Sequence, residues 1–199
     1  MGQSRLATDK KKAQRLRASI AFIDETGYLV APLVRRTWAP CGQTPTLIQK
    51  GRFHSKASCI GTLVVNPNRS KVRMYFRIHR DQTLNAHTIR DFLAQLCRQC
   101  KGPIVIVWDR LSAHKGRVMK EFFVKHPRIR IEWLPPYAPE LNPIEYAWGY
   151  LKMNPLANRA FFDTRMLAKE AYRASRKIQH EDRLLRSFIR ASGLFLRFK

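Results

Sequence analysis

The sequence predicts an α/β fold in which a mixed β-sheet is flanked by helices. Short segments with strand-like composition occupy the chain before residue 80. After residue 85 the spacing of apolar residues becomes helical, and helices are expected to alternate with strands. The continuous apolar run PIVIVW at residues 103–108 is typical of a parallel strand buried on both faces. Early strands followed by helix–strand units indicate a mixed sheet covered by helices.

Six segments are predicted to be strands. They are residues 18–23, 28–35, 57–65, 72–78, 103–108 and 129–134. The first ends in DETG, a turn sequence, so the second is expected to return as the other half of a hairpin. The alternation in the fourth exposes Arg73 and Arg77 on one face.

Apolar residues at helical spacing predict five helices. One follows Asn85, one covers residues 114–125, one begins at Pro143, and two lie in the chain after Asp163. The residues expected to face inward are Ile89, Leu93, Leu96 and Cys100; Val118 and Phe122; Ile144, Trp148 and Leu151; Leu167, Ala171, Ala174 and Ile178; and Leu185, Phe188 and Ile189. We expect a basic tail over residues 1–17, a central α/β domain over residues 18–160 and a basic helical extension over residues 161–199.

The composition points to a polyanionic partner. Lys and Arg number 38 against 14 Asp and Glu, which gives a net charge of +24. Such a field attracts nucleic acid, although a ribosomal-type or membrane-surface protein would share it. No apolar run approaches the roughly 20 residues that span a bilayer, and the basic N-terminus lacks the apolar region of a secretory signal. A cytosolic location is therefore expected.

The four cysteines are too few for a disulfide framework in a chain of this length. Cys97 and Cys100 have the CxxC spacing of zinc ligands, but no second pair completes four ligands. Both also continue the apolar face of a predicted helix, so we interpret them as buried core thiols.

Three acidic residues stand at the ends of predicted elements. Asp24 follows one apolar strand, Asp109 follows PIVIVW, and Glu145 lies in the first turn of the helix that begins at Pro143. Each has a structural alternative, because acids at strand ends form turns and Asn142-x-x-Glu145 fits a capping box. Together they suit Mg²⁺ or Mn²⁺, and two such ions about 3.5–4 Å apart can promote phosphodiester cleavage.

At these residues the chain resembles the DDE transposases, and within them the bacterial insertion-sequence branch of the mariner superfamily. The matching segments are FIDETG, VWDRLSAHKG and LPPYAPELNPIEYAWGYLK, with RRTWAPCGQTP at residues 35–45. Thirty-five residues lie between Asp109 and Glu145, which fits that branch. The resemblance runs over about residues 20–152. It implies a ribonuclease-H-like, mixed five-stranded sheet, with Asp24 and Asp109 on adjacent central strands and Glu145 on a helix beside them.

The resemblance also implies an activity. Asp24, Asp109 and Glu145 would hold two Mg²⁺ or Mn²⁺ ions, with Asp24 bridging them. DNA would be cut at the ends of the element, and the freed 3′-hydroxyl would attack a target. DNA contacts are expected at Lys152, His114, Arg110 and Lys115. Lys152 could equally be a solvated lysine, and His114 a helix cap or a contact to the attacking water. Glu25 points to the opposite side of its strand from Asp24, so it is excluded from the site.

The partners that the resemblance implies are double-stranded DNA of transposon ends and target, and a second protomer on that DNA. Full-length relatives begin with helix-turn-helix domains, so a separately encoded helix-turn-helix half is a further expected partner. The expected location is the bacterial cytoplasm, at the nucleoid. Two alternatives remain. One is a non-catalytic DNA-binding fragment of a split or truncated transposase, and the other a ribonuclease-H-type nuclease that acts on RNA–DNA hybrids.

Overall fold

The computed structural model describes residues 17–49, 55–111, 114, 116–194, 196 and 198. Within these residues five strands form one sheet in the order β3-β2-β1-β4-β5. The strands are β1 (Ser19–Leu29), β2 (Lys56–Val65), β3 (Val72–Arg80), β4 (Ile104–Trp108) and β5 (Ile129–Trp133). The first three pair antiparallel, whereas β4 pairs parallel to both β1 and β5. The predicted mixed sheet is confirmed.

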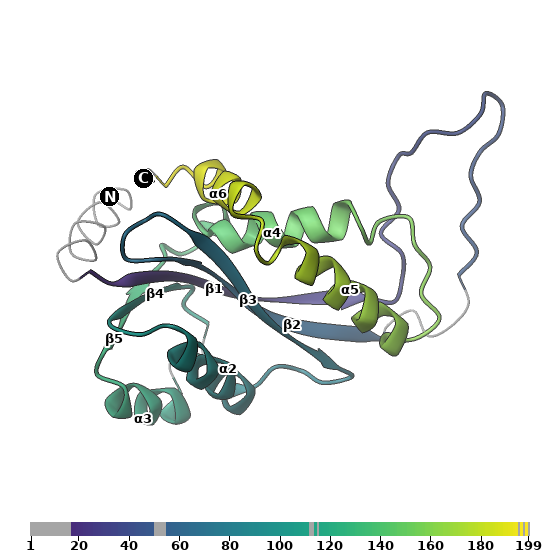
Figure 1. Ribbon diagram of the computed structural model, residues 1–199. Helices are drawn as coiled ribbons and strands as arrows, with labels where there is room; N and C mark the ends of the chain where they lie inside the picture. Colours follow the sequence, from purple (N-terminus) through teal and green to yellow (C-terminus); the bar gives the residue numbers. More distant parts are fainter. Residues whose placement is uncertain are drawn as a thin grey trace.

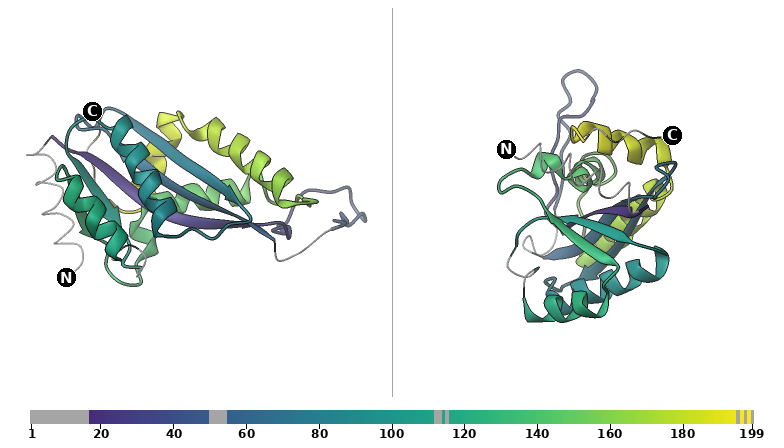
Figure 2. Two further views of the ribbon diagram at one scale, coloured as in Figure 1. Left: turned by 90° about the horizontal axis from the view of Figure 1, so that it is seen from below. Right: turned by 90° about the vertical axis from the view of Figure 1, so that its left-hand side faces the viewer.

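Helices cover both faces of the sheet (Figures 1 and 2). Helices α2 (Ala86–Gln99) and α3 (Arg117–Lys125) lie on one face. Helices α4 (Pro143–Met153), α5 (Thr164–Ile178) and α6 (Asp182–Ala191) lie on the other. Each layer encloses its own apolar core, and β1 contributes alternate residues to both. Phe22 faces α4 and Ile23 faces α2, as expected for a strand buried on both sides.

The helices begin where local chemistry favours it. Asn85 caps α2 by accepting from the N–H of His87 and Thr88, and Thr88 completes a capping box. Asp163 caps α5 by accepting from the N–H of Met166. The inward faces predicted for α2, α4, α5 and α6 are all buried, which confirms their periodicity.

Two predictions about local structure are wrong. The DETG sequence is not a turn, because β1 continues through it to Leu29 while residues 24–29 pair with β2. The hairpin strand over residues 28–35 therefore does not exist, and residues 31–49 leave the body as an irregular arm (Figure 1). Helix α3 begins at Arg117 rather than residue 114, and it buries Met119 and Phe122 whereas Val118 is half-buried.

Three cysteines lie in the cores, as predicted for Cys97 and Cys100, and Cys41 is exposed on the arm. No described helix is long and apolar enough to cross a membrane. Most of the predicted basic tail, residues 1–16, lies outside the described residues, as does Lys115. Helices α5 and α6 pack into the same core as α4, and the proposed domain boundaries stay a prediction.

Candidate active site

Asp24 lies in the middle of β1, on the face that α4 covers. Its side chain is 8% exposed. The indole Nε1 of Trp148, on α4, donates a hydrogen bond of 3.0 Å to Asp24 Oδ2. This bond fixes the carboxylate of the central strand to the helix that carries Glu145.

Gly61 on β2 allows the Trp148 ring to take this position. It is the neighbour of Asp24 in the antiparallel pairing. A Cβ at Gly61 would lie 2.5 Å from Cη2 of Trp148, far inside contact distance. The absence of a side chain at Gly61 is therefore part of how the Asp24 carboxylate is held.

The start of α4 is fixed to β1 by a second bond. Asn142 precedes the helix, but its side chain does not cap it. Instead Asn142 Nδ2 donates to the carbonyl oxygen of Ile23 at 3.1 Å, in a buried position. The capping-box alternative for Asn142 and Glu145 is therefore wrong. Because the bond reaches the residue before Asp24, it places the first turn of α4, and with it Glu145, beside β1.

Asp109 follows β4 and is held by its own loop. Its Oδ1 accepts from the N–H of Leu111 at 3.2 Å and lies 2.7 Å from Nδ1 of His114. The His114 ring is stacked on Trp108, with centroids 3.7 Å apart, and its Nε2 lies 3.2 Å from Oε2 of Glu25. These contacts hold Asp109 in place after the end of β4.

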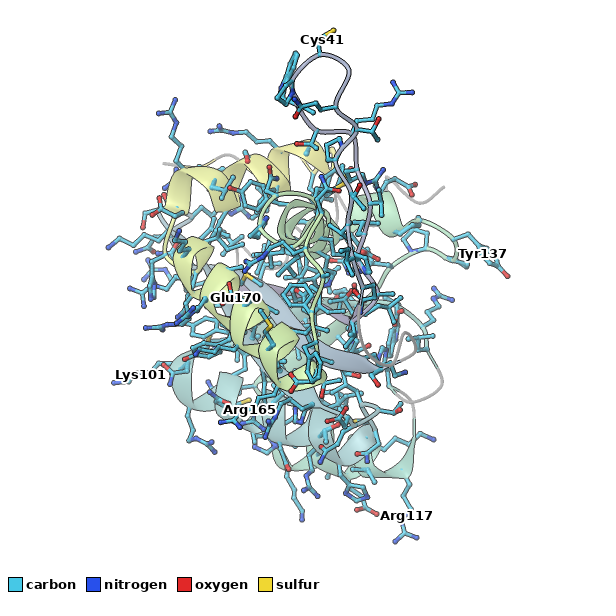
Figure 3. The ribbon with its side chains drawn as sticks, turned by 90° about the vertical axis from the view of Figure 1, so that its right-hand side faces the viewer. Cys41, Lys101, Arg117, Tyr137, Arg165 and Glu170 are labelled. Carbon is cyan, nitrogen blue, oxygen red and sulfur yellow. The ribbon has the colours of Figure 1, made fainter. Side chains whose placement is uncertain are left out.

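The three predicted acids open onto one cavity of about 470 Å³. Asp24, Asp109 and Glu145 form its acidic part, with Arg110 beside them. The other wall is the proline-rich loop before α4, which includes the fully exposed Tyr137 (Figure 3). Strand β1, the end of β4 and the first turn of α4 thus deliver one carboxylate each to a common space.

The carboxylates of this cavity disfavour their own ionisation. Burial raises the pKa of Asp24 to about 8, and the negative charges of Glu145 and Glu25 add to the effect. Burial also raises the pKa of Glu145, and Asp109 contributes in the same direction, while Lys152 opposes it. Excess negative charge in a partly buried cavity is the condition that a bound cation relieves.

The residues of the cavity fit a divalent cation in their chemistry. Their donors are carboxylate oxygens, which Mg²⁺ and Mn²⁺ prefer. Among the described residues, no three His, Cys, Asp or Glu side chains converge closely enough to hold one ion between them. Mg²⁺ usually takes only one or two protein carboxylates and keeps several waters, so an ion at this cavity does not need a group of three.

The predicted DNA contacts differ in position. Arg110 is exposed and lines the cavity of the three acids. Lys152 is half-buried, and its positive charge lowers the pKa of Glu145. His114 is only 2% exposed, and its contact with a DNA phosphate stays a prediction. Its ring nitrogens are directed at Asp109 and Glu25 because Trp108 holds the ring between them.

A family model described as DDE superfamily endonuclease matches residues 19–168. The chain belongs to this family. No curated protein matches it. The DDE superfamily therefore accounts for three-quarters of the chain, from the start of β1 into α5.

Solved structures of the Mos1 transposase have a similar fold. The Mos1 paired-end complex with Mg gives a TM-score of 0.60 at 18% identity, over 96% of this chain and 58% of that chain. The paired-end complex with the left transposon end gives 0.58 at 17% identity, over 98% and 61%. The strand transfer complex gives 0.54 at 19% identity, over 98% and 60%. This DDE endonuclease thus has a ribonuclease-H-like fold and spans about three-fifths of the length of those Mos1 chains.

Sequence reasoning missed several residues around the acids of this DDE endonuclease. Glu25 does point away from Asp24, but it contacts His114, whose other ring nitrogen contacts Asp109. Trp148 was recognised as buried, but its bond to Asp24 joins residues 124 positions apart and leaves no local signal. Gly61 and Asn142 likewise act through contacts that only the packed fold creates.

Proposed function

We propose that this chain is the catalytic domain of a transposase that nicks DNA and transfers strands with the help of divalent cations. The observation that carries the proposal is the shared cavity of Asp24, Asp109 and Glu145. Membership of the DDE endonucleases and the net charge of +24 support the same reading.

In the proposed reaction, water attacks the scissile phosphorus, the bond to the 3′-oxygen breaks, and a 3′-hydroxyl is released. In strand transfer that 3′-hydroxyl attacks a phosphodiester of the target. A new bond forms from its oxygen to the target phosphorus, the target's own bond from phosphorus to the 3′-oxygen breaks, and a target 3′-hydroxyl is released. Divalent cations, when bound, supply charge neutralisation and Lewis acidity at the reacting oxygens. We propose that Asp24, Asp109 and Glu145 would hold two Mg²⁺ or Mn²⁺ ions through their carboxylate oxygens.

The surrounding residues have supporting roles in this proposal. Trp148 and Asn142 keep α4 against β1, so that Glu145 stays opposite Asp24. Arg110 lines the cavity and is proposed to attract phosphates toward it, and Lys152 and Lys115 are proposed to assist. His114 acts on Asp109 rather than on DNA.

The direct test is nicking of supercoiled plasmid DNA in Mn²⁺. We expect the wild-type chain to nick the plasmid and Asp109→Asn to lose nearly all activity, because the substitution removes an anionic ligand. Asp91→Asn is the matched control, since Asp91 is exposed on α2, where it pairs with Arg90. Nicking that persists in Asp109→Asn would contradict the proposal. DNA binding without any nicking would instead support a non-catalytic DNA-binding fragment.

The substrate and partners follow from the same proposal. The Mos1 structures are described as paired-end and strand transfer complexes. We propose that this chain also acts on duplex transposon ends and target at the bacterial nucleoid, as two protomers on DNA, with a helix-turn-helix half encoded separately. Light scattering of the DNA complex tests the stoichiometry, and cleavage of an RNA–DNA hybrid beside the duplex of equal sequence tests the substrate.

A further inference from the structure

Helix α5 is buried on one face and basic on the other. Its inward residues are Thr164, Leu167, Ala168, Ala171, Ala174, Ser175 and Ile178. On the outward face, Arg165, Lys169, Tyr172 and Arg176 follow at helical spacing, so they form one narrow arc. All four side chains are exposed. Figure 3 looks onto this helix and labels Arg165 near its beginning.

The arc carries no acid to balance its three cations. The acid of α5, Glu170, lies beside the arc and bonds Arg159 and Arg173, each at 2.9 Å. Among the described residues, Arg165 and Lys169 have no ion-pair partner. They are four residues apart on one helix face, where like charges repel.

The helices on the opposite face of the sheet also combine paired and unpaired cations. Arg90 pairs with Asp91 on α2 and Arg117 with Glu121 on α3, whereas Arg98, Lys120 and Lys125 have no ion-pair partner among the described residues. What distinguishes α5 is that its exposed cations share one arc of the helix. A polyanion laid along the arc would offset the repulsion among them.

The residue types on the arc indicate which polyanion and how it is held. Arg, Lys and Tyr all contact phosphate oxygens, so the arc offers donors to a nucleic-acid backbone. At a rise of about 1.5 Å per residue, Arg165 and Lys169 lie about 6 Å apart along the helix axis, and Lys169 and Arg176 about 10.5 Å, with Tyr172 between them. This row can follow a nucleic-acid backbone. Contacts of this kind position DNA without reading its sequence.

The arc is separate from the catalytic cavity. Helix α5 packs on the edge strand β3: Thr164 donates to Asp81 Oδ2 at 2.9 Å at one end, and the carbonyl of Gln179 accepts from the N–H of Met74 at 3.2 Å at the other. The buried face of α5 lies across β3, β2 and β1, and none of the four residues on its outward arc lines the cavity of Asp24, Asp109 and Glu145. We propose that the outward face of α5 binds the phosphate backbone of a duplex DNA segment outside the catalytic cavity, independently of sequence. The inference rests on the proposed function only in taking duplex DNA as the partner.

The test measures binding of a 30-bp duplex without divalent cations, so that no cleavage occurs. The variant Arg165→Gln/Lys169→Gln/Arg176→Gln neutralises the arc with residues of good helix propensity. The matched control Arg98→Gln/Lys120→Gln/Lys125→Gln removes three exposed cations from α2 and α3. The logarithm of the binding constant is followed against the logarithm of salt concentration, and circular dichroism confirms that both variants are folded.

We expect the α5 variant to bind at least tenfold more weakly at 0.1 M salt and to have a slope shallower by about 2–3, since each phosphate contact contributes about 0.9. The control should change the slope by less than one. Equal changes in both variants would mean diffuse attraction and would overturn the inference. Because no divalent cation is present, the binding measurement is independent of plasmid nicking. The α5 variant could bind DNA as well as wild type while the wild-type chain still nicks plasmid, which would contradict the inference alone. Absence of nicking with a clear binding loss in the α5 variant would contradict the proposed function alone.

Discussion

At the scale of single residues, the site depends on side chains that are not themselves acids. Asp24 and Asp109 each receive a contact from an aromatic or imidazole ring that is fixed by packing. Such neighbouring contacts orient metal-binding carboxylates and commonly change affinity or activity when removed. Two substitutions test what these contacts do to Asp109 and Asp24.

His114→Ala removes the contact to Asp109 Oδ1 and leaves Glu25 without its partner. We expect plasmid nicking to fall about 10–100-fold, and the Mn²⁺ concentration for half-maximal activity to rise, because Asp109 is no longer oriented. The KM for DNA should be unchanged, since His114 is buried. His87→Ala, at an exposed position on α2, is the control. A loss confined to KM would show that His114 contacts DNA instead.

Trp148→Phe keeps an aromatic ring between α4 and β2 but removes the donor to Asp24 Oδ2. We expect the free energy of unfolding to fall by about 1–3 kcal/mol, the range for losing a buried hydrogen bond. Chemical denaturation measures it, with the exposed Trp38→Phe as control. In an Asp24→Ala background the same substitution should cost less, because the acceptor is already absent. If Trp148→Phe lowered the free energy of unfolding equally in the wild-type and Asp24→Ala proteins, the loss would come from packing and not from the hydrogen bond to Asp24.

At the scale of elements, a segment could be predicted from the sequence when the contacts that stabilise it are made by residues close to it in the chain. Helices α2 and α5 were predicted because their caps and apolar stripes are local. Strand β4 was predicted because a fully buried strand is apolar throughout. The DETG segment was wrong because turn-forming residues were overridden by pairing with β2, whose partners lie more than 30 positions away. The three acids were recognisable by motif, but the bonds that place them were not.

The contact between β2 and α4 gives an element-scale prediction. Gly61→Ala would place a Cβ 2.5 Å from the Trp148 ring, so the ring must move and its bond to Asp24 lengthen. We expect a loss of about 1–3 kcal/mol in unfolding free energy, as for overpacked cores, together with reduced nicking.

Gly27→Ala is the matched control on the neighbouring strand, because a Cβ there meets nothing within 4 Å. It should be neutral or stabilise the protein by up to about 1 kcal/mol. If Gly61→Ala were as well tolerated as Gly27→Ala, Trp148 would have another position available, and its bond to Asp24 would not control the site.

At the scale of the whole molecule, a charge of +24 on 199 residues opposes folding by self-repulsion. Salt screens that repulsion, since the Debye length falls to about 10 Å at 0.1 M and about 3 Å at 1 M. We therefore expect the Tm to rise by several degrees between 20 mM and 500 mM NaCl, measured by differential scanning calorimetry without DNA. The Arg98→Gln/Lys120→Gln/Lys125→Gln variant, with three fewer positive charges, should start from a higher Tm at 20 mM NaCl and respond less to salt. A Tm that falls with salt would mean that attractive ion pairs such as Arg186–Asp182 outweigh the repulsion. The positive charges would then be neutralised by ion pairs within the fold, and fewer of them would be free to attract a polyanion.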